Sequence, residues 1–204
     1  MAASRRWRRL DIAASCVILP TTYAALDDVL APALGREAPD AVLMIGVAGR
    51  SRRVRIERRA MNRASVLLPD AAGRWPDRLT LAQGPAARHL GASPVRLRAV
   101  MRRHAVPCGI SQDAGRYLCN AAYYRALAAP IPVLFVHIPK PPAKGRRRVS
   151  GSPRLSWSDR LAAALADVAV QLLRSGPGSP GCRASSRPLS HKEDPPEETV
   201  CMWQ

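Results

Sequence analysis

Two short and almost wholly apolar runs constrain the fold of this chain more than any other feature. They are AVLMIGV at 41–47 and PVLFVHIP at 132–139. Runs of this length, without a polar residue at every second position, are typical of strands that are buried on both faces. Such strands need helices on each side of their sheet. We therefore predict an α/β protein with a mostly parallel sheet.

Segments with helical spacing separate the predicted strands. One lies at 22–34, a second starts at Ser93-Pro94 and reaches about Arg103, a third covers 121–127, and the last begins at Ser156 or Ser158 and stops before Gly176. Further strands are expected at 53–57, where RVRIE alternates charged and apolar residues, at 65–69 and at 108–110. The alternation of helices and strands predicts a three-layer α/β/α sandwich.

The 204 residues suffice for one domain with a sizeable core. We expect this single domain to cover residues 1–174. Residues 175–204 are rich in Pro, Gly, Ser and Glu without periodicity, which predicts a disordered tail. The basic, proline-containing segment 141–153 is predicted to be an exposed loop.

The five cysteines show neither a C-x-x-C pair nor metal-ligand spacing, so they support neither a disulfide framework nor a zinc site. We expect no cofactor and no metal. No apolar run approaches the ~20 residues of a membrane-spanning helix, and we expect no membrane partner. The opening RRWRRL resembles an export signal, but Asp11 and Pro20 interrupt the stretch that follows it. A cytoplasmic location is therefore predicted.

The formal net charge of +17 raises nucleic-acid binding as a function. Nearly all of the 32 basic residues are arginines, however, and alanine is also abundant, as the codon bias of a GC-rich genome would produce. Only RRWRR and KGRRR are dense, and neither has the interleaved aromatic residues of a single-strand binding surface. We interpret the charge as a solvated basic surface and do not expect nucleic acid as a partner.

Cys119 is the first candidate for chemistry. It ends the stretch SQDAGRYLCN and lies in the first turn of the predicted helix, where unpaired backbone N–H groups and the helix dipole favour a thiolate. A thiol with an ordinary pKa of ~8.5 still needs a base at neutral pH. If the helix end and a charged histidine lower the pKa of Cys119 by about two, the thiolate gains roughly 2.7 kcal/mol.

His137 and Glu57 are the candidates for the base and for the acid that orients it. His137 lies at the carboxyl end of a buried strand, where open α/β sheets place their active sites. Glu57 ends the strand RVRIE. Each residue also has an ordinary interpretation: a lone strand-end histidine is most often structural, a lone cysteine at a helix start is most often inert, and Glu57 among arginines can be a surface ion-pair partner. Spacing alone does not choose between these interpretations.

Three motifs in order resemble the pyroglutamyl-peptidase I family, also called pyrrolidone-carboxylate peptidases. GVAGRSRRVRIERRAMN at 46–62 is similar to the glutamate motif of the family, ISQDAGRYLCN at 110–120 to its cysteine motif, and FVHIP at 135–139 to its histidine motif. A weaker likeness runs from about Val17 to Leu173. Each motif alone is a weak signal, but three in the order of the family are a strong one.

The resemblance implies that Glu57, Cys119 and His137 form the triad of a cysteine exopeptidase, which removes N-terminal pyroglutamyl residues from peptides through a thioester. Cys119 would attack the carbonyl, His137 would move the proton, and Glu57 would orient the imidazole. The resemblance also favours a homo-oligomer, which nothing in the residues themselves indicates. No substrate-binding residue can be assigned.

The chain departs from the family at its start and in one loop. It lacks the first strand and the Gly-Phe-x-Pro-Phe loop, and its one phenylalanine is Phe135 of the histidine motif. Leu67 stands where the family usually has an arginine. Either the true start lies upstream, which we expect because an interior first strand is hard to lose, or the protein is a remnant with a triad and no substrate pocket. The second function class left open is therefore an inactive α/β binding module with a basic surface.

Overall fold

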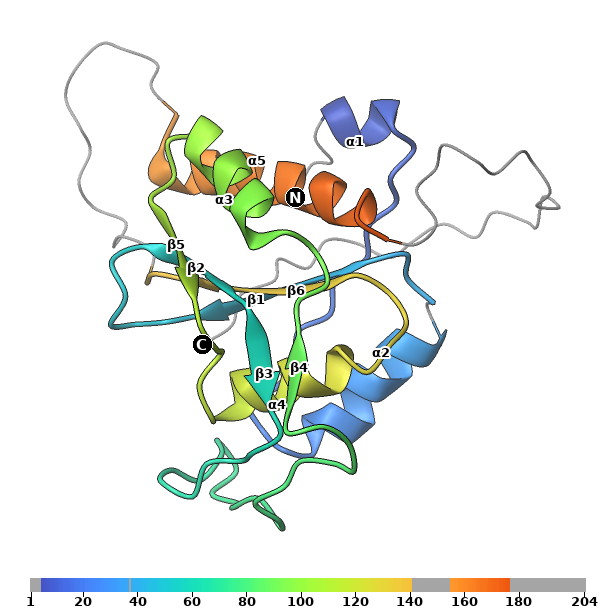
Figure 1. Ribbon diagram of the computed structural model, residues 1–204, viewed down its shortest axis with the longest axis vertical. Coiled ribbons are helices and arrows are strands. Elements are labelled where there is room, and N and C mark those ends of the chain that lie inside the picture. Colours follow the sequence, from blue (N-terminus) through green and yellow to red (C-terminus); the bar gives the residue numbers. More distant parts are fainter. Residues whose placement is uncertain (1–4, 37, 141–154, 177–204) are drawn as a thin grey trace, which may run out of the picture.

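The computed structural model describes residues 5–36, 38–140 and 155–176, and its centre is a four-stranded sheet in the order β1-β6-β2-β5 (Figure 1). These strands are β1 (Val42–Val47), β2 (Val54–Glu57), β5 (Cys108–Ser111) and β6 (Val133–Ile138). β1 runs parallel to β6 and β2 runs parallel to β5, whereas β2 and β6 are antiparallel. The expected mostly parallel α/β sheet is thus present, with one antiparallel pair at its middle.

Two helices cover one face of the sheet (Figure 1). They are α3 (Pro94–Arg103) and α5 (Trp157–Leu173), and their N-caps are Ser93 and Ser156, as the sequence predicts. Ser156 also forms a reciprocal capping box with Asp159, which satisfies backbone donors at the helix start. Strand residues that point to this face pack with the helices into one apolar cluster, which includes Val54, Ile56, Leu134, Val136, Leu97 and Val168.

The opposite face of the sheet is covered by α4 (Leu118–Ala126), by the π-helical turn η1 (Leu26–Leu30) and by α2 (Ala31–Arg36). The predicted helix at 22–34 is therefore a π-helical turn that continues into a short α-helix. Met44 and Phe135 of the sheet pack here against Tyr123, Tyr124 and Leu30. Helices on both faces confirm the three-layer sandwich. A further short helix, α1 (Arg5–Arg9), is tied to α5 because the indole N–H of Trp7 donates to the Ala166 carbonyl over 3.1 Å.

The prediction of a strand at 65–69 is wrong. This segment belongs to a long connection between β3 (Arg59–Met61) and β4 (Ala87–His89), which pair with each other in a small antiparallel sheet. Leu67 is 82% exposed, so its segment has no second layer to pack against. Asp70 fixes the connection instead, because its carboxylate accepts hydrogen bonds from the N–H groups of Tyr23, Ala72 and Arg74.

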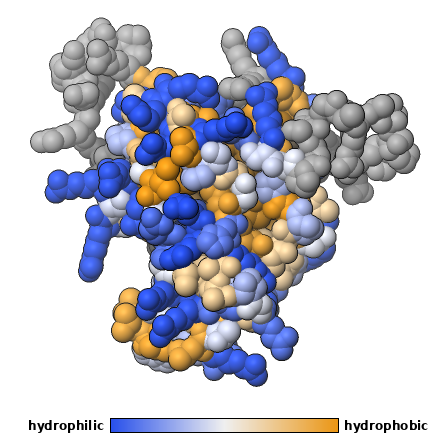
Figure 2. Space-filling model, viewed as in Figure 1, coloured by the Kyte–Doolittle hydropathy of each residue, from blue (hydrophilic) through white to orange (hydrophobic). Residues whose placement is uncertain are grey.

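Apolar side chains of this connection remain on the surface. Figure 2 shows apolar surface at the lower end of the molecule, where this connection lies in Figure 1. The large exposed apolar residues of the segment are Val66, Leu67, Leu68, Trp75 and Leu79.

Three sequence expectations concern the rest of the chain. Among the described residues, no helix is long and apolar enough to cross a membrane. Cys16 is disulfide-bonded, whereas Cys108 and Cys119 are free thiols, so one disulfide exists in a chain whose cysteine spacing gave no sign of it. The predicted loop at 141–153 and nearly all of the predicted tail at 175–204 lie outside the described residues.

Candidate active site

Strand alternation places Glu57 and His137 on the same face of the sheet. Val54 and Ile56 point toward α3 and α5, so Arg55 and Glu57 of β2 point toward α4. On β6, Phe135 packs with the α4 side of the core, and His137 follows two residues later on the same face. The antiparallel register pairs Arg55 with His137. The acid and the histidine are therefore neighbours across one strand pair.

Glu57 and His137 form a buried hydrogen bond. The distance from Nδ1 of His137 to Oε1 of Glu57 is 2.7 Å, and the two side chains are 7% and 0% exposed. The ring of Phe135 lies beside the imidazole, with centroids 4.8 Å apart. In a neutral imidazole the proton would lie on Nδ1, which faces the carboxylate, and this tautomer leaves Nε2 free to accept a proton.

Cys119 approaches the same region from α4. It is the second residue of the helix, as the sequence predicts, and Tyr117 at the N-cap makes no side-chain capping bond. A Cβ atom added to Gly46 would lie 3.2 Å from the Cys119 sulfur, and Gly46 is the register partner of His137 on β1. The structure therefore brings the thiol to the strand position next to the histidine.

The thiol of Cys119 is less acidic than its place in the helix suggested. Burial raises the pKa of Cys119 to about 11, and the charge of Glu57 adds to this increase, while its own backbone N–H and the charge of Arg55 lower it by less. Desolvation therefore outweighs the helix end, contrary to the expected decrease. The thiol is protonated at neutral pH, and it needs a base to release the proton.

The hydrogen bonds of the Asn120 side chain explain why an asparagine follows Cys119. Its side chain is fully buried, and Oδ1 accepts a hydrogen bond from the Met61 N–H over 2.7 Å. Its Nδ2 donates to the carbonyls of Met61 and Arg63 over 2.9 and 3.1 Å. These three bonds attach the first turn of α4 to β3 and its continuation, and so they fix the residue that carries the thiol.

Gly46 leaves the space in which the sulfur lies. A Cβ atom at this position would approach Cζ of Phe135 to 2.8 Å, which is closer than real contacts allow. Position 46 therefore requires a glycine because neighbouring side chains approach it closely, and not because its backbone angle is unusual.

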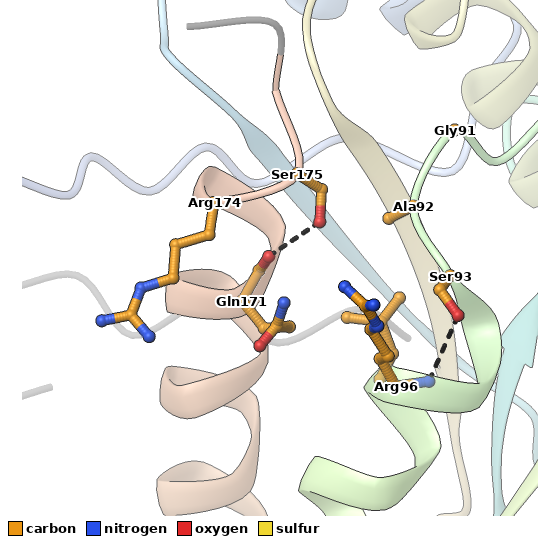
Figure 3. Close-up of a pocket in the computed structure, with 8 residues that line it drawn as sticks. Gly91, Ala92, Ser93, Arg96, Gln171, Arg174 and Ser175 are labelled. Atoms are coloured by element: carbon orange, nitrogen blue, oxygen red, sulfur yellow. Dashed lines mark hydrogen bonds between the residues drawn. The ribbon is translucent and has the colours of Figure 1, made fainter. Parts of the chain in front are cut away.

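A small apolar cavity adjoins Cys119. It has a volume of about 60 Å³ and is lined by residues of 19–22, β1, α4 and Phe135. Small-molecule sites usually have ~300 to 1,000 Å³, so this cavity must widen before a ligand enters. A larger hollow of about 240 Å³ lies between the start of α3 and the end of α5 (Figure 3). Arg96 and Arg174 at this hollow are exposed, and it is remote from the cysteine in the fold.

Sequence reasoning missed Arg55, which contacts Glu57, and the bracing role of Asn120. The alternation in RVRIE could have revealed Arg55, because residues two apart on a strand share a face. Nothing local in the sequence indicates which backbone groups Asn120 binds.

Comparison with known proteins gives one consistent result. A family model described as pyroglutamyl peptidase matches residues 9–173. The pyrrolidone-carboxylate peptidase of Gloeobacter violaceus is 33% identical over 135 residues, which are 63% of this chain and 66% of that protein. The enzyme of the same name from Chromobacterium violaceum is 33% identical over 160 residues, 77% of this chain and 75% of the relative.

A solved structure, pyroglutamyl peptidase I of Bacillus amyloliquefaciens, superposes with a TM-score of 0.66 at 29% identity, covering 78% of this chain and 79% of that one. Against several curated relatives the match spans only about half to two thirds of their length, including 53% of the protein from Thermococcus kodakarensis.

Proposed function

Since the chain belongs to the pyroglutamyl peptidase family, we propose that it is a cysteine exopeptidase that removes N-terminal pyroglutamyl residues from peptides. The proposed catalytic residues are Glu57, Cys119 and His137. The observation that carries the proposal is the buried 2.7 Å hydrogen bond between Glu57 and His137, next to the strand position that the sulfur of Cys119 adjoins. The proposed catalytic domain is 1–174, which the family match over 9–173 supports.

The raised pKa of Cys119 determines how the reaction starts. Because the resting thiol keeps its proton, the nucleophile forms only when His137 accepts that proton. The sulfur then attacks the carbonyl that links the pyroglutamyl residue to the next amino acid. The imidazolium passes its proton to the leaving amine, and the carboxylate of Glu57 stabilises the charge of the imidazolium in the meantime.

The start of α4 is suited to stabilise the oxyanion of this step. The N-cap residue Tyr117 contributes no side-chain hydrogen bond, so its side chain does not occupy the first N–H groups of the helix. Loss of one such donor typically costs ~2.7 to 4 kcal/mol of transition-state stabilisation. Water finally hydrolyses the thioester, which releases pyroglutamate and the free thiol.

Replacing Cys108 and Cys119, the two free thiols among the described residues, one at a time tests this proposal. We expect Cys119→Ser to abolish hydrolysis of a chromogenic pyroglutamyl amide, because an alcohol is a far weaker nucleophile at this site. Cys108→Ser is the matched control, since burial also raises the pKa of Cys108 to about 11 but β5 holds it outside the site. The corresponding prolyl amide, which lacks the lactam carbonyl, should not be cleaved by any of these proteins. Turnover that survives Cys119→Ser, or that both substitutions abolish equally, would refute the assignment.

Two finer parts of the proposal concern the assembly, for which the family resemblance is the ground, and the location, for which the interrupted apolar stretch after RRWRRL is the ground. We propose a homo-oligomer, which size-exclusion chromatography with light scattering tests directly, and a monomer at micromolar concentration would contradict it. We also propose a cytoplasmic location, which cell fractionation checks.

A further inference from the structure

The proposed triad does not explain what compensates the negative charge of the buried Glu57 carboxylate. Its carboxylate is 0% exposed, and in the described part of the chain its second oxygen, Oε2, has no hydrogen-bond partner. A buried carboxylate with one unpartnered oxygen is costly unless a cation compensates its charge. A neutral imidazole donates a hydrogen bond to Oε1 but supplies no positive charge.

Arg55 supplies this positive charge. Its Nε lies 3.3 Å from Oε1 of Glu57, the same oxygen that binds Nδ1 of His137. Nε itself is buried and without a hydrogen bond, so the contact with the carboxylate is ionic. The side chain is 40% exposed, which lets the rest of the guanidinium reach water.

We infer that Arg55 is a positioning residue, which neutralises Glu57 in the resting site and thereby keeps His137 uncharged and ready to accept the proton of Cys119. The inference rests on the proposed function for the role of His137. Without Arg55, the imidazole would be the one cationic partner left to the buried carboxylate among the described residues, and an imidazolium cannot act as a base.

The other groups around His137 support this account. On β2 the charged neighbours are Arg55 and Glu57, on α4 the titratable neighbour is Cys119, and β1 contributes only the register partner Gly46. The hydroxyl of Tyr123 donates to the Glu57 carbonyl, and burial raises its pKa, so it stays neutral. Within the described part of the chain, Arg55 is therefore the cation that acts on the pair.

The experiment compares the full chain with Arg55→Gln, Arg55→Lys and the control Arg52→Gln, whose side chain is exposed on the loop before β2. Two rates are measured from pH 5 to pH 9. One is alkylation of Cys119 by iodoacetamide, followed on the Cys119 peptide by mass spectrometry, which needs no substrate binding. The other is kcat/KM for the chromogenic pyroglutamyl amide. Circular dichroism verifies that each variant is folded.

Removal of the Arg55 charge favours the form of the site in which His137 carries an extra proton. In Arg55→Gln we expect the midpoint of the acid limb to move up by about half to one pH unit in both rates. Arg55→Lys should recover at least half of this shift, and Arg52→Gln should not move the midpoint. A merely structural role would lower the rates at every pH and leave the midpoint in place.

An unchanged midpoint in Arg55→Gln, or a shift to lower pH, would overturn the inference. The two rates separate this outcome from a failure of the proposed function. If none of the proteins cleaves the amide while the alkylation midpoint still shifts, the proposed function fails and the role of Arg55 stands.

Discussion

Replacing Asn120 with alanine should destabilise the protein more than almost any other single polar substitution. The change removes the three hydrogen bonds that join α4 to Met61 and Arg63. The site is fully buried, so water cannot easily replace the lost partners. The N–H of Met61 and the two carbonyls would be left without the groups that satisfy them now.

The magnitude follows from these contacts. A hydrogen bond contributes about 0.5–1.5 kcal/mol net, and a buried group left without its partner costs about 1–3 kcal/mol. Three bonds that share one side chain should together lower the free energy of unfolding by about 3–4 kcal/mol. This is a large share of the ~5–15 kcal/mol that a typical domain has.

Asn120→Asp provides a sharper form of the test. The carboxylate can still accept a hydrogen bond from the Met61 N–H. Its other oxygen, however, would face the Met61 and Arg63 carbonyls, which accept hydrogen bonds from Nδ2 of Asn120 in the unchanged protein. Protonation restores one donor, so folding raises the pKa of the introduced carboxyl above its ordinary ~3.9. The stability that depends on this proton is fully present below pH ~3.9, and it is lost as the pH rises through the folded-state pKa.

Urea denaturation followed by circular dichroism at pH 4 and pH 7 measures both effects. Gln112→Ala is the control, because its side chain is exposed and its one hydrogen bond to Arg58 lies at the surface. That control should change stability by no more than ~0.5 kcal/mol. A loss below ~1 kcal/mol in Asn120→Ala, or an Asn120→Asp variant whose deficit is the same at both pH values, would refute the reasoning.

Two further predictions concern the space and the acidity around the thiol. Gly46→Ala should lower the free energy of unfolding by about 1–3 kcal/mol and slow amide hydrolysis, because the new methyl group would press on Phe135 and Cys119. Gly49→Ala, where a Cβ meets nothing within 4 Å, is its control, and equal effects of the two would count against close packing at Gly46. Since burial raises the folded-state pKa of Cys119 to about 11, well above its ordinary ~8.5, the unfolded chain releases this proton first, and stability should fall by about 2–3 kcal/mol between pH 9 and 11. Urea denaturation under reducing conditions at pH 8 and 10.5 should show a smaller fall in Cys119→Ala, and an equal fall in both proteins would disprove the assignment.

Local sequence patterns located most of the regular elements. The apolar runs became β1 and β6, Ser93 and Ser156 cap the helices that they were expected to cap, and Cys119 lies in the first turn of α4. These features depend on residues close together in the chain, so the sequence alone reveals them. The strand prediction at 65–69 was wrong because an apolar stretch has the sequence pattern of a strand even where no second layer covers it.

By itself, then, the sequence determined the α/β class and picked out Glu57, Cys119 and His137, since periodicity, capping and motif order are properties of the linear chain. Only the tertiary structure decided that β2 runs antiparallel to β6, which sets His137 beside Arg55 and Glu57. It also decided that burial makes the Cys119 thiol a weak acid in spite of its place at a helix start. Strand direction and desolvation depend on contacts between residues far apart in the chain, and no local pattern carries them.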